Sequence, residues 1–426
     1  MDTPGVEKRP IFYGWWIVLS GFLLLFLFAG AGFYSFSIFI HPLETDFGWS
    51  RSQISLAMTI YLVVNGIMAP LVGYMTERFG PRRVMTLFVI GFGVSFILVS
   101  LIQALWHFYL AYALVAFMSA GVGFVPVSTV LARWFTRRRG TALGLSMLGI
   151  SVGGLVMSPF IEFMNTAYSW RTAFVFMGIL VWVIGLPVTL FVIKGNPRDM
   201  GLLPDNDLPE EVSGESPADK LSAQGPPLEG GWPLQAALKS RFFWSIVATF
   251  ILAPAAQMGV LQHQMPLVMG VGVSGTVAAA ALGFTAGLGG VGKLSFGRIS
   301  ELVPVHLAAL LCFGLQALGV LVLYYASSMV SVWAYVFIFG FAMGGNIVLL
   351  PIVVGHYFGL VSFGVIIGIV TFFQALGAGS GAIISGLVYD YTGSYEIALQ
   401  LYVGLYLLAI VAIFSAGRPR EYQPDA

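Results

Sequence analysis

Residues 73–83 read Gly-Tyr-Met-Thr-Glu-Arg-Phe-Gly-Pro-Arg-Arg and connect two long apolar stretches of the chain. The glycine at the start allows close approach of a second helix, and the acid four residues later can cap a helix or pair with a cation. Charges at such a connection can hold one end of a helix bundle shut, and they must separate for that end to open. We therefore predict a gate formed by Gly73, Glu77, Arg78, Gly80, Arg82, Arg83 and, from a later connection, Arg133.

The composition around this stretch is that of a membrane protein. Of 426 residues, 58% are apolar and 9% are charged, against about 25% charged in a soluble domain, and the mean hydropathy is +0.90. These values exclude a soluble enzyme and a disordered scaffold, and a net charge of +1 gives no field that attracts nucleic acid. The single cysteine, Cys312, excludes a disulfide and a thiolate metal cluster. With no nucleophile–base pair and no phosphate loop in the sequence, we predict no enzymatic activity, no cofactor and no metal.

Twelve mainly apolar segments are long enough to cross a bilayer as helices. They are Tyr13–Ile40, Ser52–Met75, Val84–Ala104, Phe108–Leu131, Thr141–Phe163, Ala173–Ile193, Phe243–Val268, Gly275–Ser300, Leu307–Tyr325, Val332–Tyr357, Phe363–Tyr389 and Ile397–Phe414. The first is too long for the core of a secretory signal, so we expect it to be retained. The domains predicted are a six-helix bundle at 1–193, a polar linker at 194–241 that ends in a short helix, and a second bundle at 242–426.

The lysines and arginines fix the predicted orientation. Seventeen of the twenty lie at the termini, in the linker or in the connections after even-numbered spans; Arg51 and Arg171 lie on the other side, and Lys293 lies within a span. This bias places both termini and the linker in the cytoplasm. We therefore expect a multi-pass protein of the plasma (inner) membrane whose partners are the lipid bilayer and a small substrate, not nucleic acid. Its oligomeric state stays open, a monomer included.

An internal repeat relates the two halves. The pairs Pro42 and Pro266, Gly48 and Gly272, Ser50 and Ser274, Gly73 and Gly297, and Glu77 and Glu301 are all separated by 224 positions. Two parallel homologous bundles enclose a cavity near mid-membrane, and rocking about it gives alternating access. The fold class predicted is therefore all-α, with twelve transmembrane helices in two pseudo-symmetric bundles. The second copy of the gate, at 297–304, lacks the paired arginine and glycine, which predicts an asymmetric gate.

Several motifs resemble those of a known family. Residues 73–83 resemble the GxLaDRxGrrr signature of the major facilitator superfamily, with Glu77 where Asp is usual. Residues 13–18 (Tyr-Gly-Trp-Trp-Ile-Val) and 133–144 (Arg-Trp-Phe-Thr-Arg-Arg-Arg-Gly-Thr-Ala-Leu-Gly) resemble signatures of the monocarboxylate transporter family and of its bacterial oxalate/formate-antiporter-like relatives. The resemblance implies the major facilitator fold and transport of a small carboxylate.

Lys293 is the one cation predicted deep inside a span, and four nearby glycines leave room beside it. A buried charge is a functional hypothesis by default, and a lone cation favours an anion. In the family that the chain resembles, an arginine of this span binds the substrate carboxylate, and Lys293 aligns with it. Lysine offers a point charge instead of a planar fork. The alternative is a structural lysine whose ammonium reaches the cytoplasmic interface.

The proton carrier is less defined. Animal members of the family carry an acid where this chain has Gly289 and a lysine where it has Tyr34, so their proton relay is not retained here. His263, near Pro266, and Lys293 are the titratable candidates, although His263 is equally suited to be a neutral polar ligand or a structural hydrogen-bonding group. Further candidates for substrate contacts are Tyr34, Asn65, Asn346 and Gln374.

Three functions remain open at this point. The first is symport of a lactate- or pyruvate-like monocarboxylate with a proton. The second is an oxalate/formate-type anion exchanger, which needs no proton carrier; the lack of a cation in the eleventh span disfavours a dianion. The third is an efflux pump for apolar compounds, which the aromatic content of 15% permits, but which usually needs an acid inside the membrane.

Overall fold

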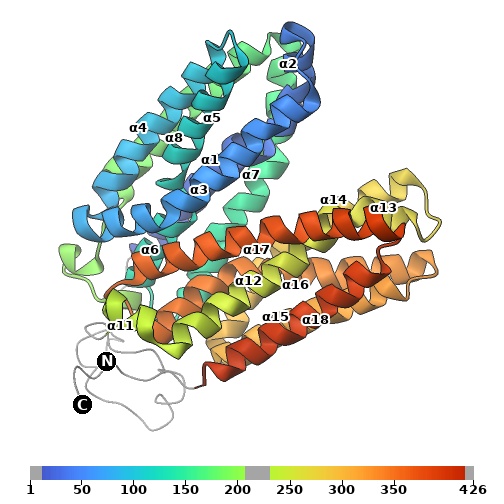
Figure 1. Cartoon of the computed structure of the whole chain (residues 1–426). Helices are drawn as coiled ribbons and strands as arrows, with labels where there is room; N and C mark the ends of the chain where they lie inside the picture. Colours follow the sequence, from blue (N-terminus) through green and yellow to red (C-terminus); the bar gives the residue numbers. More distant parts are fainter. Residues whose placement is uncertain (1–11, 207–230, 418–426) are drawn as a thin grey trace, which may run out of the picture.

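The structure is a computed structural model that describes residues 12–206 and 231–417, and these residues are almost entirely helical (Figure 1). The first half contains α1 (Gly14–Ala29), a π-turn η1 (Gly30–Tyr34), a 3-10 turn η2 (Phe36–Phe39), α2 (Ile40–Phe47), α3 (Arg51–Phe79), α4 (Pro81–Ser100), α5 (Leu105–Ala120), α6 (Phe124–Trp134), α7 (Arg139–Ala167), α8 (Trp170–Pro187) and the π-turn η3 (Val188–Val192). Five basic residues used to predict the orientation, Lys8, Arg9, Lys220, Arg418 and Arg420, lie outside the described residues.

The second half repeats this order. After the short turns η4 (Pro197–Met200) and η5 (Pro204–Asn206) and the helix α11 (Leu234–Lys239), it contains α12 (Arg241–Gln262), α13 (Gln264–Met269), α14 (Gly275–Leu302), α15 (Val305–Tyr324), α16 (Met329–Phe358), α17 (Phe363–Thr392) and α18 (Glu396–Ser415). Eleven helical segments in the described ranges are long and apolar enough to cross a membrane. The 28-residue α14 packs between α7 and α16 and completes the predicted twelve.

The offset of 224 positions reappears in the helix boundaries. Helix α3 begins after Ser50 and α14 begins after Ser274, and each serine side chain accepts a hydrogen bond from the backbone N–H three residues later. The glycines before these caps, Gly48 and Gly272, both have positive φ, 68° and 90°, a conformation that glycine adopts without strain. The two halves are therefore built by the same local rules, which confirms the predicted pair of pseudo-symmetric bundles.

Three predicted spans are interrupted where the sequence supplies a breaker. The first changes from α to π geometry at Gly30–Tyr34, where Ser35 Oγ donates to the carbonyl of Ala31 at 2.5 Å. The fourth is interrupted between α5 and α6 by residues 121–123, which read Gly-Val-Gly. The seventh ends at Gln262 because Pro266 has no N–H and its ring clashes with the carbonyl four residues earlier.

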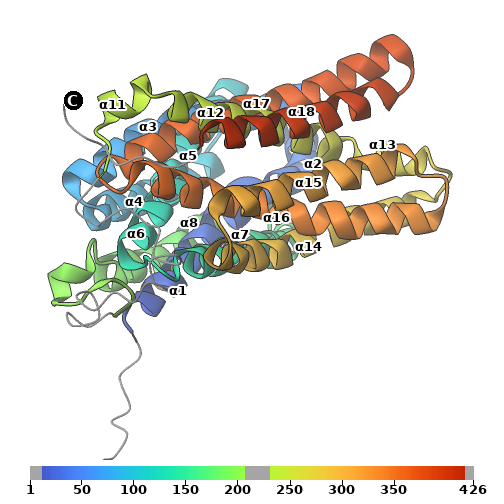
Figure 2. The same cartoon turned by 90° about the horizontal axis from the view of Figure 1, so that it is seen from below.

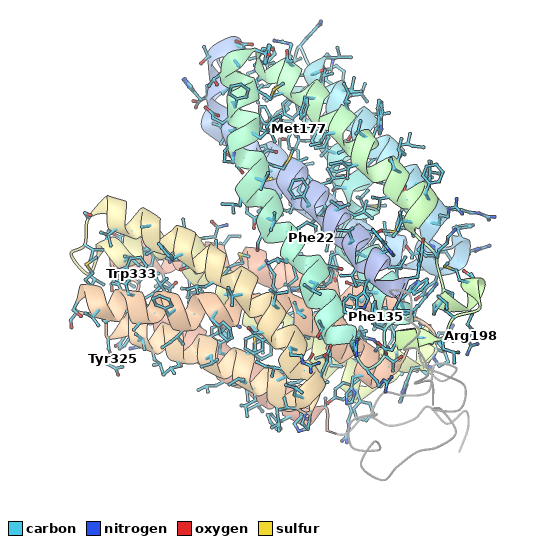
Figure 3. The ribbon with its side chains drawn as sticks, turned by 180° about the vertical axis from the view of Figure 1, so that it is seen from behind. Phe22, Phe135, Met177, Arg198, Tyr325 and Trp333 are labelled. Atoms are coloured by element: carbon cyan, nitrogen blue, oxygen red, sulfur yellow. The ribbon has the colours of Figure 1, made fainter. Side chains whose placement is uncertain are left out.

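The halves meet at one end and diverge at the other (Figure 1), and seen from below they overlap (Figure 2). Helix α3 packs on α17, and α7 packs on α14. In Figure 3, Phe135 lies near the junction of the halves, while Met177 and Trp333 lie at the far ends of their respective halves. The start of the linker is attached to the first half, because the Asp205 carboxylate accepts hydrogen bonds from the backbone of Thr136 and Arg137 at 2.8 and 2.6 Å.

Candidate functional site

Glu77 joins the halves at the end where they touch. Its Oε1 accepts hydrogen bonds from the backbone N–H groups of Gly364 at 2.5 Å and Val365 at 3.2 Å. These are the first turn of α17, so an acid of one half caps a helix of the other. Gly73 makes this possible, because a side chain there would collide with the carbonyl of Gly364. We call this end, with the C-termini of α3 and α14 and the N-termini of α7 and α17, the closed end.

Glu301 makes the equivalent contact from the second half. Its Oε1 accepts from the backbone N–H of Thr141 at 2.5 Å, and its Oε2 accepts from the Thr141 hydroxyl at 2.9 Å and from Arg298 at 2.7 Å. Thr141 belongs to the first turn of α7. The asymmetry expected from the degraded second motif therefore does not extend to the acid. The carboxylate of Glu301 is bonded by Thr141 and Arg298, neither of which is a residue lost from the motif.

The predicted gate arginines play different parts. Arg133 is partly buried and its charge acts on Glu77. Arg78 is exposed; it donates to the Tyr74 hydroxyl and lies over the Phe79 ring. The exposed Arg82 and Arg83 follow the turn at Gly80, whose φ of 84° requires glycine.

Away from the closed end, the facing helix surfaces are exposed. On α7, Leu155 is one turn beyond Ser151 and two beyond Leu148, on the same face, yet it is 75% exposed. On α14, a Cβ at Gly290 would contact Leu148, whereas a Cβ at Gly287 would meet nothing within 4 Å. On α3 and α17 the pattern is the same: Gly368 contacts Ala69 and Pro70, whereas Gly379 is open and Leu62 and Ile383 are exposed. The space between the halves thus opens at the end opposite to the closed end.

Lys293 lies at the base of this opening. It is 9% exposed, and its Nζ donates a 2.6 Å hydrogen bond to Ser151 Oγ of α7 in the other half. The small residues expected around it bring the helices together: the backbone of Lys293 contacts Gly144, and a Cβ on Gly344 would collide with the carbonyl of Gly289. The ammonium therefore reaches across the two halves instead of toward the membrane surface.

Ser151 was not among the predicted candidates. A serine inside a glycine-rich span normally bonds its own helix, so nothing in its sequence surroundings distinguishes it. The repeat places α7 and α17 at equivalent positions in the two halves. Both helices contact the opposite half, α7 through α14 and α17 through α3. In the structure its hydroxyl accepts a hydrogen bond from Lys293 of the other half.

Two predicted residues lie in the first half. Tyr34 ends the π-turn, is 42% exposed, and packs its ring on α7 at Gly154, where a Cβ would lie 2.7 Å from the ring. Asn65 on α3 donates to the carbonyl of Ala116 at 3.3 Å and to Ser119 Oγ at 3.1 Å. Asn65 therefore joins α3 to α5 within the first half.

Two more lie in the second half. Asn346 on α16 is 3% exposed and donates to Gln257 Oε1 of α12 at 2.7 Å, while its own Oδ1 is buried without a hydrogen-bond partner among the described residues. Because this bond uses the carbonyl oxygen of Gln257, the half-buried Gln257 presents its NH₂ group as a donor. Gln257 was not a predicted site residue. Gln374 on α17 is half-buried.

His263 lies at the break between α12 and α13, near the open end. Its Nδ1 is 3.1 Å from the hydroxyl of Tyr395, the residue before α18. The neighbouring Gln264 bonds to Thr285 Oγ1 at 2.8 Å, and Thr285 precedes Lys293 by eight residues, or about 12 Å of helix. The structure therefore does not bring the two titratable candidates together.

Comparisons with known proteins agree with this architecture. The family model described as "Major Facilitator Superfamily" matches residues 22–381. The chain is 25% identical over 402 residues to monocarboxylate transporter 13 of Bos taurus, an alignment that covers 93% of this chain and 87% of that protein. It is 22% identical over 409 residues to monocarboxylate transporter 12 of Mus musculus, covering 91% and 82% of the two chains.

Solved structures show the same fold at low identity. FucP, described as a Major Facilitator Superfamily transporter in the outward conformation, has a TM-score of 0.70 at 13% identity, covering 94% of this chain and 98% of that one. The human organic anion transporter MFSD10 has a TM-score of 0.70 at 15% identity, covering 95% and 100%. This protein is therefore a multi-pass membrane transporter that belongs to the Major Facilitator Superfamily, and within it the chain is similar to monocarboxylate transporters.

Proposed function

We propose that the protein transports a small monocarboxylate, of the lactate or pyruvate type, and that Lys293 binds the carboxylate. The observation that carries this proposal is the Lys293–Ser151 hydrogen bond at the base of the opening. Lys293 is a buried ammonium group that binds a hydroxyl, although a carboxylate is a much stronger acceptor for it. An incoming carboxylate that shares or replaces the hydroxyl would contact both halves at once.

An anion at this position also supports alternating access. A buried charge without an opposite charge is unfavourable, and within residues 12–206 and 231–417 the Lys293 ammonium has one hydrogen-bond partner, the Ser151 hydroxyl. A bound carboxylate neutralises the ammonium and lets the halves close over it. Phe33, Tyr34 and Phe284 are exposed beyond this point and offer apolar contacts to a short carbon chain.

We further propose that the closed end is cytoplasmic and the opening faces outward, as the distribution of basic residues predicts. Opening the cytoplasmic end then requires the Glu77 and Glu301 caps to break while the opposite ends of the halves come together. Only one pair of interfaces opens at a time, so the substrate is exposed to one side of the plasma (inner) membrane and then to the other.

Coupling to a proton makes import of the anion electroneutral. Lys293 and His263 are the candidate carriers. A second mode, exchange of one carboxylate for another, is favoured by the location of His263, because its position near the open end leaves no second candidate carrier beside Lys293 among the described residues. Exchange requires no proton carrier.

Uptake into proteoliposomes tests these proposals. Labelled lactate, pyruvate, formate and oxalate are supplied with and without an inward-acid pH gradient, and with and without unlabelled anion inside. Symport predicts lactate or pyruvate uptake that rises with the gradient; stimulation by internal anion alone establishes exchange, and absence of uptake of all four contradicts the carboxylate proposal. In His263→Gln, an altered pH profile identifies His263 as the carrier, and an unaltered profile excludes it.

A further inference from the structure

Two adjoining surface clefts lie at the closed end of the first half, outside the interface between the halves. The first, about 430 Å³, lies between α4 and η3 and is lined by Arg82, Arg83, Thr86, Leu87, Ile90 and Leu190. The second, about 380 Å³, includes Lys194 and Asp199 and shares Arg82 and Arg83 with the first. We call the two together the α4–η3 groove. Helices α4 and α8 pack side by side here (Figure 1), and the loop that carries Arg198 follows (Figure 3).

The chemistry of this groove changes along its length. Arg82 and Ile90 are eight residues apart on one face of α4, or about 12 Å of helix. The groove is basic at the helix N-terminus and apolar toward the membrane interior, where Leu87, Ile90 and Leu190 are exposed. A ligand that fits this gradient has an anionic end at the water boundary and a hydrocarbon end in the bilayer.

The basic end is available to a ligand. Neither Arg82 nor Arg83 forms an ion pair within the described ranges, and both are exposed. Three cations line the groove against one carboxylate, Asp199. Below them the hydroxyl oxygen of Thr86 is buried and has no hydrogen-bond partner among the described residues. The basic end of the groove therefore carries an excess of positive charge beside an unsatisfied hydroxyl.

We propose that the α4–η3 groove binds one anionic phospholipid, with the phosphodiester on Arg82, Arg83 and Lys194 and an acyl chain along Leu87, Ile90 and Leu190. Basic pockets between helices at the membrane surface suit anionic head groups, and the positive N-terminus of α4 adds to their attraction for phosphate. The apolar lower half of the groove favours a lipid over free phosphate, which would leave it uncovered.

Binding is measured on the full-length protein in detergent by native mass spectrometry and by thermal unfolding, with added phosphatidylglycerol, phosphatidylethanolamine, soluble glycerol 3-phosphate or inorganic phosphate. We expect saturable binding and stabilisation by phosphatidylglycerol alone, and at least tenfold weaker binding in Arg82→Gln/Arg83→Gln. The control is Arg241→Gln, which removes an arginine outside the groove from the start of α12. Leu87→Gln/Leu190→Gln tests the acyl contact and is expected to weaken phosphatidylglycerol binding as well.

Each other outcome overturns the proposal. Equal stabilisation by glycerol 3-phosphate or inorganic phosphate shows an anion site without a lipid. Equal binding of phosphatidylethanolamine shows a site that does not select for net charge. Unchanged phosphatidylglycerol binding in the double arginine variant, or the same loss in Arg241→Gln, shows that the lipid binds elsewhere. None of these readouts depends on which substrate is transported, so the result is independent of the proposed function.

Discussion

At the scale of single residues, variants of Lys293 test whether transport needs its positive charge. Lys293→Ala removes the cation and is expected to reduce carboxylate uptake at least tenfold, since a hydrogen bond to a charged group contributes about 1.5–3 kcal/mol and 1.4 kcal/mol is a factor of ten. Lys293→Arg keeps the charge and is the matched control; we expect it to retain uptake. Full uptake by Lys293→Ala in the same proteoliposome assay would exclude Lys293 as the group that binds the carboxylate.

Ser151→Ala tests the other partner. It keeps the charge of Lys293 but removes the hydroxyl to which Nζ donates. We expect a several-fold rise in KM with a smaller change in kcat, because a neutral partner contributes about 1 kcal/mol. Ser158→Ala, on the same helix two turns away, controls for general effects on α7, and an equal rise in KM there would remove the special role of Ser151.

The amide pair of Gln257 and Asn346 provides a test of substrate polarity. If the free NH₂ of Gln257 faces the substrate, Gln257→Leu should reduce uptake of lactate or pyruvate several-fold more than uptake of an unsubstituted carboxylate such as propionate, which has no second oxygen to accept a bond. The measurement is the ratio of kcat/KM values for the two substrates. An unchanged ratio would limit Gln257 to holding α12 against α16.

At the scale of helices, the closed end depends on two caps that cross between the halves. Glu77→Gln and Glu301→Gln each remove a negative charge from the N-terminus of a helix, an effect of about 1 kcal/mol and hence about a fivefold shift away from this arrangement. Because the caps lie on different helix pairs, we expect the double variant to show roughly the sum in free energy. Double electron–electron resonance across the closed end measures the populations.

Glu162→Gln is the matched control for those variants. Glu162 is exposed near the opposite end of α7, so its loss should leave the populations unchanged. A shift with Glu77→Gln but none with Glu301→Gln would restore the asymmetric gate predicted from the degraded second motif. The sequence named Glu77 as a gate residue and Glu301 only as its counterpart in the repeat. It did not reveal their partners, because a backbone N–H at a helix start carries no residue signature.

At the scale of the whole molecule, the helices and their pairing into halves followed from hydropathy and from the repeat at 224 positions. The breaks in the first, fourth and seventh spans were harder to predict in detail. The site was predicted only in part. Lys293 stands out because charge is rare in a membrane-spanning sequence. The roles of Ser151 and Gln257 depend on contacts with helices that are distant in sequence, so they could not be predicted.

The direction of the opening has its own test. Gly287→Cys places a thiol in open space beyond Lys293, while the native Cys312 is buried. A membrane-impermeant maleimide added from outside should label this variant. Adding Gly297→Val should reduce labelling, because a Cβ at Gly297 collides with the carbonyl of Gly140 and disfavours the arrangement in which the closed end is shut. Labelling only from the cytoplasmic side would reverse the orientation proposed above.

The crossed caps also bear on how such a chain arose. Glu77 bonds to Val365 and Glu301 bonds to Thr141, and the members of each exchanged pair, 77 with 301 and 141 with 365, are 224 positions apart. A contact made twice with its members exchanged is the pattern of a symmetric homodimer, in which residue i of one subunit meets residue j of the other and the reverse. An ancestral six-helix protein could therefore have formed this interface by self-association, and gene fusion would have preserved both copies of the contact without inventing either.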